Sequence, residues 1–546
     1  MENSSINSLI SVESLEEDLK SFLSDPETTH DLKTAVSKAH EILNHNDKSS
    51  YAHYTLALNE VAYANKLAPL SNFDPSIKRL KSIIEMDPNF LEAYLMLAKL
   101  YKDSDKQKEF EILNEANKKF PDNFLIMYDL ANIKLHTTGE KNEAVDLFSK
   151  CVQKLPQIAN NWGSLGTAYL FTRELEMAKT CFETALSIEP DHVPSILGIG
   201  VYHYENANFE EAKKFYQESL KIDGGSYYGN MNLAYLELLI GDQVKGHEMY
   251  EKRDKNHFLK KYGGSGFKEM QKINTRKNSN EKLIILNEQG FGDDIMFSRY
   301  LKPLVELGYK PTMMEQPELV DLMKLSPDLD GIEIRSNLPE CDPNTFKYRT
   351  FLLSLPYIMG DFLKKKPDPL FIDSKRIIEK DLKNLNKINN TLTSKKFKVG
   401  FSWSGNPKHH RHFNRSIELT KFSEIFDNHD IEFFAIQKGI NPVDKKILKN
   451  YKNVKNCDDL LADFLHTAYI VSKMDMIISV DTSLVHLSGS MKKETKLLLP
   501  KVPDWRWGVD SKQEWYPSVE NFRQTTIDDW SDPINKIKKV LNEKVS

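Results

Sequence analysis

The chain has 546 residues and a net charge of −5, carried by 74 basic and 79 acidic side chains. That length predicts three or four domains, and the near balance of charge excludes a domain-wide basic surface for nucleic acid. No apolar run approaches the roughly 18 residues that a transmembrane segment needs, and the acidic start lacks the apolar core of a signal peptide. The scattered cysteines form no C-x-x-C pair, which argues against structural zinc and fits a reducing, cytoplasmic compartment: Cys151, Cys181, Cys341 and Cys457.

Prolines recur through the first half of the chain at nearly constant intervals. The intervals are 33, 35 and 34 residues, between Pro88, Pro121, Pro156 and Pro190. A fifth junction, at 223–225, has glycine in place of proline. This period is that of tetratricopeptide repeats, in which each helix pair buries its face on its neighbours. We therefore predict a superhelix of about six repeats over residues 1–256.

Small and aromatic residues inside each repeat support this layout. Gly166 and Ala168 are small where two helices would cross closely, and Phe182 lies where the second helix returns. Three aromatic side chains on first helices either line the concave groove or pack between helices: Tyr94, Tyr128 and Trp162. A groove lined by helices binds a peptide or a partner domain, so the repeats predict an interaction rather than a reaction.

After a polar junction at 257–281, the hydrophobic period changes. Short apolar runs alternate with helical patterns, which predicts parallel sheets in an α/β region. These runs are "LIILNE" (283–288), "FKVGFSW" (397–403), "IEFFAIQ" (431–437), "MIISV" (476–480) and "TKLLLP" (495–500). The length predicts two Rossmann-like halves, at 282–390 and 391–546, divided near the charged segment 375–396. Two such halves place a cleft between the carboxyl ends of their strands.

The first of these strands is followed by "LNEQGFGDDIMFSRYL". Gly290 and Gly292 permit a tight turn and the close approach of a ligand. A nicotinamide dinucleotide is a weak alternative, because Ile295 stands at the third glycine of the G-x-G-x-x-G fingerprint. Asp293 and Asp294 open the next helix, where each charge is worth about 0.3–1 kcal/mol even without a functional role.

A second polar loop, "SGNPKHHRHFNRS", follows the strand at 397–403. Its glycine-containing part is Ser404, Gly405, Asn406 and Pro407, and Arg415 and Ser416 precede the next helix. The histidines lack the spacing of a rigid metal-ligand pair, so we expect no metal at His409, His410 and His412. The acidic pair around Leu329, Asp328 and Asp330, precedes a glycine and is better explained as a turn.

The third loop, "ISVDTSLVHLSG", begins with an aspartate at the mouth of an apolar strand. Asp481 ends that strand, and Thr482 and Ser483 lie in the first turn of a predicted helix that also carries His486. The N–H groups and the dipole of a helix start suit a pyrophosphate. The alternative is that Asp481 only caps the helix.

Together, "EQGFGD", "WSGNPKHHRHFNRSIEL" and "ISVDTSLVHLSG…LLLPKVPDWRW…WYPS" closely resemble bacterial tetratricopeptide-repeat proteins with a glycosyltransferase family 9 (heptosyltransferase-like) domain. The resemblance covers roughly residues 283–523. The layout is more remotely similar to the O-linked N-acetylglucosamine transferases. The resemblance implies an α + α/β chain whose repeats precede a GT-B region, with the acceptor on 282–390 and the sugar nucleotide on 391–546. It also implies an inverting transfer that uses neither a metal nor a cofactor.

The resemblance also implies roles for individual residues. Asp293 matches a proposed general base, and Arg415 matches a basic residue at the donor diphosphate. The donor side is completed by Ser416, Gln437, Lys438, Asp481, Thr482, Ser483 and His486. The candidate loop residues, on both halves, are Gly290, Gly292, Ser404, Gly405 and Asn406. Two departures stand out: Asp294 where a small or hydroxyl residue is expected, and His412-Phe413 where a charged pair is expected. The first leaves open which aspartate acts.

The chemistry of sugar transfer agrees with these residue types. A departing nucleoside diphosphate builds negative charge, which a fixed arginine and helix N–H groups stabilise, while a carboxylate takes the proton of the acceptor. Two alternatives stay open. One is an interaction scaffold with a degenerate GT-B region, and the other is a nucleotide-sugar epimerase.

Overall fold

The computed structural model of the chain divides into two compact units, Met1–Tyr202 and His203–Ser546. It describes residues 13–23, 32–66, 72–255, 268–269, 281–288, 290–336, 346, 348–360, 366–377, 382–383, 385–406, 412–509 and 515–546. Most of the predicted junction, together with Cys341, Pro407, His409 and His410, lies outside these residues.

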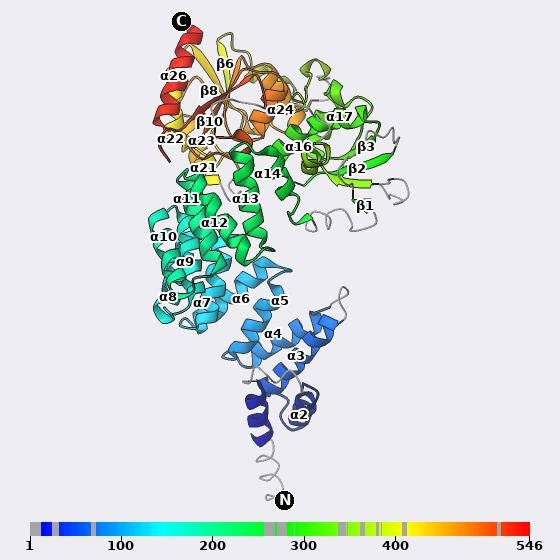
Figure 1. The fold of residues 1–546 in the computed structure, drawn as a ribbon, viewed down its shortest axis with the longest axis vertical. Helices are drawn as coiled ribbons and strands as arrows, with labels where there is room; N and C mark the ends of the chain where they lie inside the picture. The colour runs from blue at the N-terminus through cyan, green and yellow to red at the C-terminus, as the bar shows by residue number, and fades with distance from the viewer. Residues whose placement is uncertain are drawn as a thin grey trace, which may run out of the picture. The chain divides into compact units, whose positions relative to one another are not determined.

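The first unit is built from helices that pack on one another in chain order (Figure 1). They are α2 (Leu32–His45), α3 (Ser50–Lys66), α4 (Asp74–Met86), α5 (Leu91–Tyr101), α6 (Lys106–Lys119), α7 (Phe124–Ile133) with its π-helical extension η2 (Lys134–Thr138), α8 (Lys141–Lys154), α9 (Ala159–Thr172) and α10 (Leu175–Ile188). Helix α11 (Val193–Glu205) spans the division between the units. The predicted helical repeat array is confirmed.

Each predicted repeat boundary falls between two helices. The prolines interrupt the helices where one pair gives way to the next, at Pro88, Pro121, Pro156 and Pro190. Gly166 and Gly198 are necessary for the close crossing, because a β-carbon there would lie 2.7 and 2.4 Å from the Phe182 ring. The small residues thus seat a large buried side chain of the neighbouring helix.

The three aromatic residues of the predicted groove are packing residues to different degrees. Tyr94 is fully buried, and its hydroxyl donates to Glu115 and to the carbonyl of Pro88. Tyr128 and Trp162 are half-buried against the core around Phe148. The packing alternative therefore holds for Tyr94, while the other two keep an exposed part.

The second unit begins with the end of α11 and continues with α12 (Phe209–Ile222), α13 (Tyr227–Leu239) and α14 (Gln243–Tyr250). Helix α13 packs on the short helix η11 (Trp505–Trp507), and α14 packs on α19 (Leu355–Met359). The last repeats consequently belong to the same compact unit as the sheets. The division falls inside the predicted array of 1–256, because these helices bury their faces on the α/β region.

The first sheet is parallel throughout, with the order β1-β5-β2-β3-β4. Its strands are β1 (Lys268–Glu269), β2 (Lys282–Leu286), β3 (Lys310–Met314), β4 (Glu333–Arg335) and β5 (Tyr348–Phe351). The connections contain α16 (Phe291–Phe297), η3 (Ser298–Tyr300), α17 (Leu301–Glu306), α18 (Pro317–Met323), η4 (Pro327–Leu329) and η6 (Leu352–Ser354). Strand β2 is central and buried because every residue after Lys282 is apolar.

The second sheet is also parallel, with the order β11-β10-β9-β6-β7-β8. Its strands are β6 (Phe397–Ser402), β7 (Ile431–Ala435), β8 (Val454–Asn456), β9 (Met476–Val480), β10 (Thr495–Leu499) and β11 (Val519–Arg523). Its helices include α20 (Leu385–Thr391), α21 (His412–Arg415), α22 (Leu419–Phe422), η9 (Ser423–Asp427), α23 (Pro442–Leu448), η10 (Asp458–Leu460), α24 (Phe464–Ser472), α25 (Ser483–Ser490) and α26 (Ser531–Val545). Aromatic rings fill its core, at Phe401, Phe422, Phe426 and Phe433.

The strand orders reverse at one point in each sheet. In the first sheet the chain runs outward from β2 through β3 to β4 and then returns to β5 on the other side of β2. In the second it runs from β6 through β7 to β8 and returns to β9 on the other side of β6. Ligands of such sheets bind at these switch points, outside the carboxyl ends of the strands. The loops after β2, β6 and β9 are the three loops that the sequence singled out.

All five predicted strands are present, and the two parallel sheets are confirmed. The unpredicted strands are short or carry charged residues, as in "EIR" and "VKN". Asp328 and Asp330 lie at the turn around η4, and Arg376 binds Asp330 through two hydrogen bonds of 2.7 and 2.8 Å. None of the helices in the described residues is long and apolar enough to cross a membrane.

Candidate functional site

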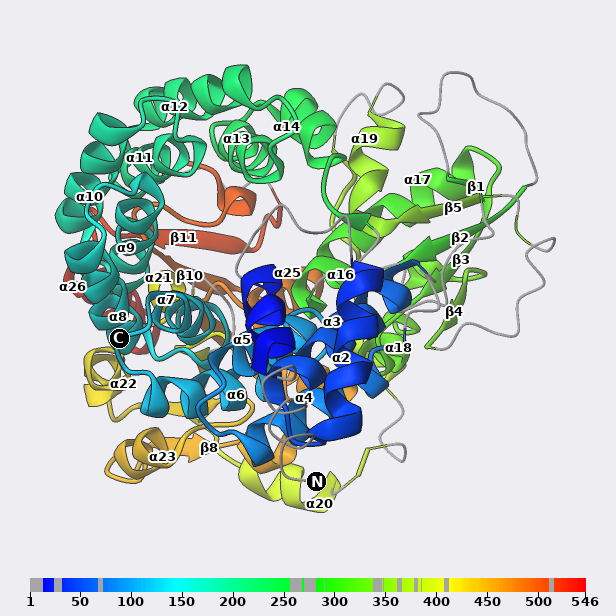
Figure 2. The same ribbon diagram turned by 90° about the horizontal axis from the view of Figure 1, so that it is seen from below.

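Helix α16 carries the first group of candidate residues. Gly290 is its N-cap in an extended conformation, and the backbone N–H groups of Asp293 and Asp294 donate to the Gly290 carbonyl at 2.9 and 3.2 Å. A β-carbon on Gly292 would lie 2.7 Å from the His486 ring and 3.5 Å from the α-carbon of Ser483. The close approach that this glycine permits is therefore that of α25, which packs beside α16 (Figure 2).

The two adjacent aspartates of α16 have different surroundings. Asp294 is fully buried, and its Oδ2 accepts hydrogen bonds from Asn287 Nδ2 at 3.3 Å and Gln316 Nε2 at 2.7 Å. Burial raises its pKa to about 6, against the opposing hydrogen bonds from Glu315, Gln316 and Asn287. Asp294 is therefore no exposed charge at the helix start, because Asn287 and Gln316 bind its carboxyl group at the ends of β2 and β3.

Asp293 instead contacts η11, the short helix between β10 and β11 of the second sheet. Its Oδ1 lies 2.5 Å from Nη2 of Arg506, on η11, and the Asp293 side chain is 13% exposed. Nη1 of Arg506 binds Asp504 at 2.6 Å. Burial raises the pKa of Asp293, and the positive charge of Arg506 opposes that rise. The carboxylate that the resemblance marks as a base is thus held in an ion pair.

Asp481 lies at the end of β9 and is buried. Thr482, not Asp481, is the N-cap of α25, since its hydroxyl accepts from the Leu484 N–H at 3.3 Å. Burial raises the pKa of Asp481 to about 6, Asp504 adds to the rise, and Arg415 opposes it. The capping alternative for Asp481 is therefore wrong, and its carboxyl group stays available for another role.

His486 lies one turn along α25 and faces α16. The ring stacks on Trp507 with centroids 5.3 Å apart, and Nδ1 lies 3.1 Å from the Tyr516 hydroxyl. Burial and, to a smaller extent, the positive charge of Arg506 lower its pKa to about 3. His486 is consequently neutral at physiological pH and serves here as a polar packing residue between α25 and α16.

The loop after β6 is held by side chains from its neighbours. Gln437 Oε1 accepts from the Ser402 hydroxyl and from the backbone N–H groups of Trp403 and Ser404, at 3.1–3.2 Å. The Ser416 hydroxyl accepts from the Gly405 N–H at 3.1 Å. These bonds give Gln437 and Ser416 the role of fixing the loop.

Arg415 lies on this loop. A β-carbon on Gly405 would lie 2.8 Å from Nε of Arg415, so the glycine makes room for the guanidinium group. Nε of Arg415 is buried and has no hydrogen-bond partner among the described residues. The arginine therefore has unused hydrogen-bonding capacity, and its positive charge opposes the rise in the Asp481 pKa.

Lys438, a predicted donor residue, and Asn406, a predicted loop residue, have other surroundings than Asp481. Lys438 Nζ donates to the carbonyl of Asp458 at 3.3 Å, within a loop that Asp458 also holds through the Gly439 and Ile440 N–H groups. Asn406 is exposed at the end of its loop. The Lys438 amine is therefore used within its own loop.

The histidine-rich loop is described only from His412 onward. His412 Nδ1 lies 3.0 Å from the Ser416 hydroxyl. Within the described residues, no three His, Cys, Asp or Glu side chains are grouped so that they could hold a metal ion. His412 therefore belongs to the hydrogen bonds that fix the loop.

The sequence interpretation assigned no role to Asp504, Arg506, Trp507 or Tyr516. The segment "PDWRW" was part of the resemblance, and its Asp-x-Arg spacing was the signal that could have identified them. Asp504 is the N-cap of η11, and its Oδ1 accepts from the Arg506 N–H at 3.1 Å. The short helix thereby projects Arg506 toward α16.

The arrangement collects opposite charges at the facing ends of the two sheets. Asp293, Asp481 and Asp504 are the carboxylates, and Arg415 and Arg506 are the guanidinium groups that act on them. A planar guanidinium binds phosphate oxygens through paired hydrogen bonds. The cluster can therefore bind an oxyanion and hold a carboxylate beside it.

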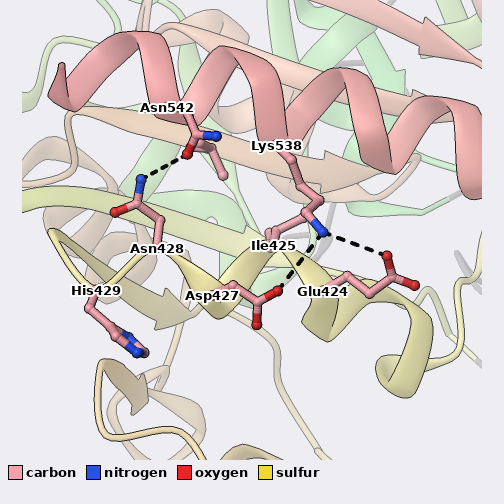
Figure 3. Close-up of a pocket in the computed structure, with 8 residues that line it drawn as sticks. Glu424, Ile425, Asp427, Asn428, His429, Lys538 and Asn542 are labelled. Carbon is pink, nitrogen blue, oxygen red and sulfur yellow. Dashed lines mark hydrogen bonds and ion pairs between the residues drawn. The ribbon is translucent and has the colours of Figure 1, made fainter.

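A surface pocket elsewhere in the unit is unrelated to this cluster (Figure 3). It lies between η9 and α26, where Lys538 is 3.9 Å from both Glu424 and Asp427, and Asn428 donates to Asn542 at 3.0 Å. None of the residues that line it was a candidate in the sequence. We assign it no role.

Comparison with known proteins supports the repeats. Residues 159–192 and 193–225 match the family model of the tetratricopeptide repeat. Anaphase-promoting complex subunit 3 of Schizosaccharomyces pombe (strain 972) is 25% identical over 163 residues, which are 30% of this chain and 24% of that protein. The chain thus spans only about a quarter of this curated relative.

Solved structures also match a part of the chain. MamA is 23% identical over 30% of this chain and 94% of its own, with a TM-score of 0.27. A tetratricopeptide-repeat protein of Thermus thermophilus is 21% identical over 30% of this chain and 89% of its own, with a TM-score of 0.28. A third, from Parabacteroides merdae, is 14% identical over 36% and 78%, with a TM-score of 0.32. Likeness at this level carries no argument about function.

Proposed function

We propose that the chain is a tetratricopeptide-repeat interaction protein that recruits a protein or peptide partner. The family match over 159–225 supports this proposal, as do the stacked helix pairs that surround it. Helical repeats of this kind offer an extended concave surface to a partner. Of the three aromatic residues predicted for the groove, Tyr128 and Trp162 are half-buried and keep an exposed part for such a contact.

A second function is favoured by one observation on the α/β region. The loops at both switch points carry Asp293 and Asp481, with Arg415 and Arg506 beside them. We infer that this region is a glycosyltransferase of the GT-B type, which transfers a sugar from a nucleotide diphosphate to the recruited partner. Arg415 then contacts the donor diphosphate and Asp293 takes the acceptor proton.

The charge of Arg415 and the raised pKa of Asp293 support these roles. A guanidinium group meets the negative charge that grows on a leaving diphosphate. Burial raises the pKa of Asp293, which makes its carboxylate a stronger base than an exposed aspartate. The free, buried thiols of Cys151, Cys181 and Cys457 fit the cytoplasm as the place of action.

Nucleotide binding is the first test of the transferase. The full chain is screened by thermal shift against UDP, GDP, ADP and CDP and their common sugar conjugates. A ligand at a hundredfold excess over its dissociation constant stabilises the folded chain by about 2.7 kcal/mol. Arg415→Ala is expected to weaken the binding of the responsive nucleotide by roughly tenfold or more, the value of one charge-assisted hydrogen bond. Unchanged affinity in this variant would move the donor site elsewhere.

Turnover is the second test. Asp293→Asn keeps the shape of the side chain and loses the base, so we expect unchanged nucleotide affinity and a loss of transfer or donor hydrolysis by about 10²–10⁴-fold. Nucleotide binding without any turnover would favour the scaffold with a degenerate α/β region. Conversion of the free sugar nucleotide into its epimer, without an acceptor, would identify an epimerase.

The recruiting function is tested by removing the first unit. The fragment His203–Ser546 corresponds to the second compact unit and keeps the last repeats that pack on the sheets. We expect this fragment to bind the nucleotide as the full chain does and to lose transfer to the native acceptor. If transfer to that acceptor is unchanged, the first unit has another role.

A further inference from the structure

Arg506 occupies a position that the proposed donor site does not yet explain. It joins two carboxylates, Asp293 at 2.5 Å and Asp504 at 2.6 Å, and is 10% exposed. The two partners differ in attachment. Asp504 lies two residues away and also caps the same short helix, whereas Asp293 belongs to α16 of the first sheet. Asp293 is therefore the partner that Arg506 can exchange without unfolding η11.

The cluster as a whole has too little positive charge for a diphosphate. When all are ionised, the carboxylates of Asp293, Asp481 and Asp504 carry three negative charges against the two positive charges of Arg415 and Arg506. A diphosphate adds at least two negative charges to this buried set. Because unpaired buried charge is costly, an arginine must be redirected or a carboxylate must take up a proton.

We propose that Arg506 is a diphosphate-binding residue that exchanges Asp293 for the diphosphate oxygens, so that donor binding itself releases the Asp293 carboxylate. This proposal rests on the proposed transferase function and assigns Arg506 to its donor site. Phosphate oxygens offer a guanidinium the same paired acceptors as a carboxylate. The exchange keeps the Arg506–Asp504 bond and breaks only the Arg506–Asp293 bond.

The exchange has a protonation signature. Burial raises the pKa of Asp293 and the charge of Arg506 holds it down, so the loss of Arg506 to the diphosphate lets the pKa rise. Other charged or titratable groups at this site are Asp504, Arg415, Asp294, Tyr516, His486, which packs against α16, and Arg299, which acts on Tyr516 and His486. None of these moves with the Arg506–Asp293 bond in the proposed exchange. Diphosphate binding therefore raises the pKa of Asp293. Where the carboxylate stays ionised it becomes a stronger base, and as the pH is lowered toward that pKa the binding is accompanied by proton uptake at Asp293.

Isothermal titration calorimetry of the full chain with inorganic pyrophosphate tests this linkage. Titrations across a range of pH, in buffers of different ionisation enthalpy, give the number of protons bound. The protons of pyrophosphate itself are common to all variants, so the difference between the wild type and Asp293→Asn gives the uptake at this site. We expect net uptake in the wild type and none attributable to this site in Asp293→Asn, which should bind pyrophosphate at least as tightly because Arg506 is no longer occupied. Asp481→Asn is the matched control and should keep most of the uptake.

Arg506 itself is tested with two variants. Arg506→Gln should lose roughly tenfold or more in pyrophosphate affinity and most of the proton uptake. Arg506→Lys keeps the charge and should regain part of both, which separates a contact from a folding defect. Equal affinity in the wild type and Arg506→Gln, or full uptake in Asp293→Asn, would overturn the proposal.

Failure of the transferase proposal and failure of the Arg506 exchange would give different results. If pyrophosphate and the nucleoside diphosphates bind through Arg506 but no transfer or donor hydrolysis is ever observed, the transferase fails and the exchange stands. If transfer occurs while the Arg506 variants bind and titrate as the wild type does, only the exchange fails. A wild-type chain that binds neither pyrophosphate nor any nucleoside diphosphate overturns both.

Discussion

Two buried arginines of the second unit, Arg253 and Arg506, each form ion pairs with carboxylates, in two different places. Arg253, after α14, binds both carboxylate oxygens of Glu288 at 2.7 and 2.8 Å and also donates to the Ser354 hydroxyl. Arg506 binds Asp293 and Asp504 at 2.5 and 2.6 Å. Both are almost fully buried, and both join a segment of the chain to the end of β2 or to the helix that follows it.

The surroundings of the two arginines differ. The Arg253 group is closed, since its donors also satisfy Glu251 and the Tyr250 carbonyl, and its partner Glu288 has no exposed side-chain surface. At Arg253, the two carboxylates of Glu251 and Glu288 face two cations, Arg253 and Lys255. At Arg506, the three carboxylates of Asp293, Asp481 and Asp504 face the two guanidinium groups of Arg506 and Arg415. Burial raises the pKa of a carboxyl group in both places. A balanced buried ion pair fixes the repeats to the first sheet, while an unbalanced one is ready to accept another ion. Charge balance, rather than burial, therefore distinguishes the structural arginine Arg253 from the proposed ligand-binding arginine Arg506.

The largest expected effect is on the balanced pair. Arg253→Met leaves Glu288 buried without its partner, and breaking such a pair costs about 3–5 kcal/mol. Five of the six tryptophans lie in residues 203–546, so urea unfolding followed by tryptophan fluorescence reports mainly on this unit. Burial already raises the pKa of Glu288 against Arg253, so the unpaired carboxyl can be neutralised by acid. The loss should be smaller at pH 5 than at pH 8.

Two controls separate burial from pairing. The double variant Arg253→Met/Glu288→Met should regain most of the stability, because a buried pair replaced by apolar side chains costs little. Arg376→Ala removes a similarly bidentate contact with Asp330, but the Arg376 and Asp330 side chains are 37% and 61% exposed. This variant should lose about 0–1 kcal/mol of unfolding free energy. A loss as large in Arg376→Ala as in Arg253→Met would contradict the role of burial.

The second effect concerns Asp294, the buried neighbour of the proposed base. Its pKa is raised to about 6, so the folded chain loses stability as the pH rises from about 4 through 6 and the carboxyl group ionises. In Asp294→Asn the side-chain oxygen still accepts from Asn287 and Gln316, and its amide faces Glu315. We expect this variant to be more stable than the wild type by roughly 2–3 kcal/mol at pH 7.5 and equal to it at pH 4.

Urea midpoints of both proteins across this pH range provide the measurement. Asp293→Asn should show a smaller pH-dependent gain, because Arg506 already balances that carboxylate. A stability of Asp294→Asn below that of the wild type at pH 7.5 would mean that the ionised Asp294 is needed by the fold.

These two aspartates show where sequence reasoning ends. The apolar strands, such as "MIISV" at β9, and the repeat boundaries at prolines are local signals, and they were predicted correctly. Asp293 and Asp294 are adjacent at a helix start, so the local pattern assigns both the same role. Which one faces Arg506 and which one faces Gln316 depends on the placement of β3 and η11, far away along the chain.

The remaining misses have the same origin. Thr482 and Asp481 are both good N-caps, and only the backbone direction at the end of β9 decides between them. Arg506 lies in a short helix between strands, with no periodic pattern to mark it. The positions of the three loops at the switch points were predictable from strand order. The charge balance among their side chains was not, because it depends on contacts between the two sheets.

The third expected effect is a loss of stability when the contact between α16 and α25 is disturbed, beside the cluster around Arg506. A methyl group on Gly292 would lie 2.7 Å from the His486 ring, so Gly292→Ala must displace one helix from the other. Overpacking of this kind costs about 1–3 kcal/mol. Gly290→Ala is the matched control, since its β-carbon meets nothing within 4 Å and its φ is −80°. Thermal unfolding should show a lower midpoint for Gly292→Ala alone; equal midpoints would mean that the helices separate freely.

The smallest effect sharpens the distinction between a cap and a site residue at the start of α25. Thr482→Ala removes the hydroxyl that accepts from the Leu484 N–H, so we expect a loss of about 1 kcal/mol at every pH, as for other caps. Asp481→Asn removes a buried carboxyl group whose pKa is raised to about 6. Because the wild type loses stability as that group ionises between about pH 4 and 6, the variant should match it at pH 4 and exceed it at pH 7.5. Urea unfolding of both variants at the two pH values decides the matter. A pH-independent loss in Asp481→Asn would return the capping role to Asp481 and remove it from the unbalanced cluster.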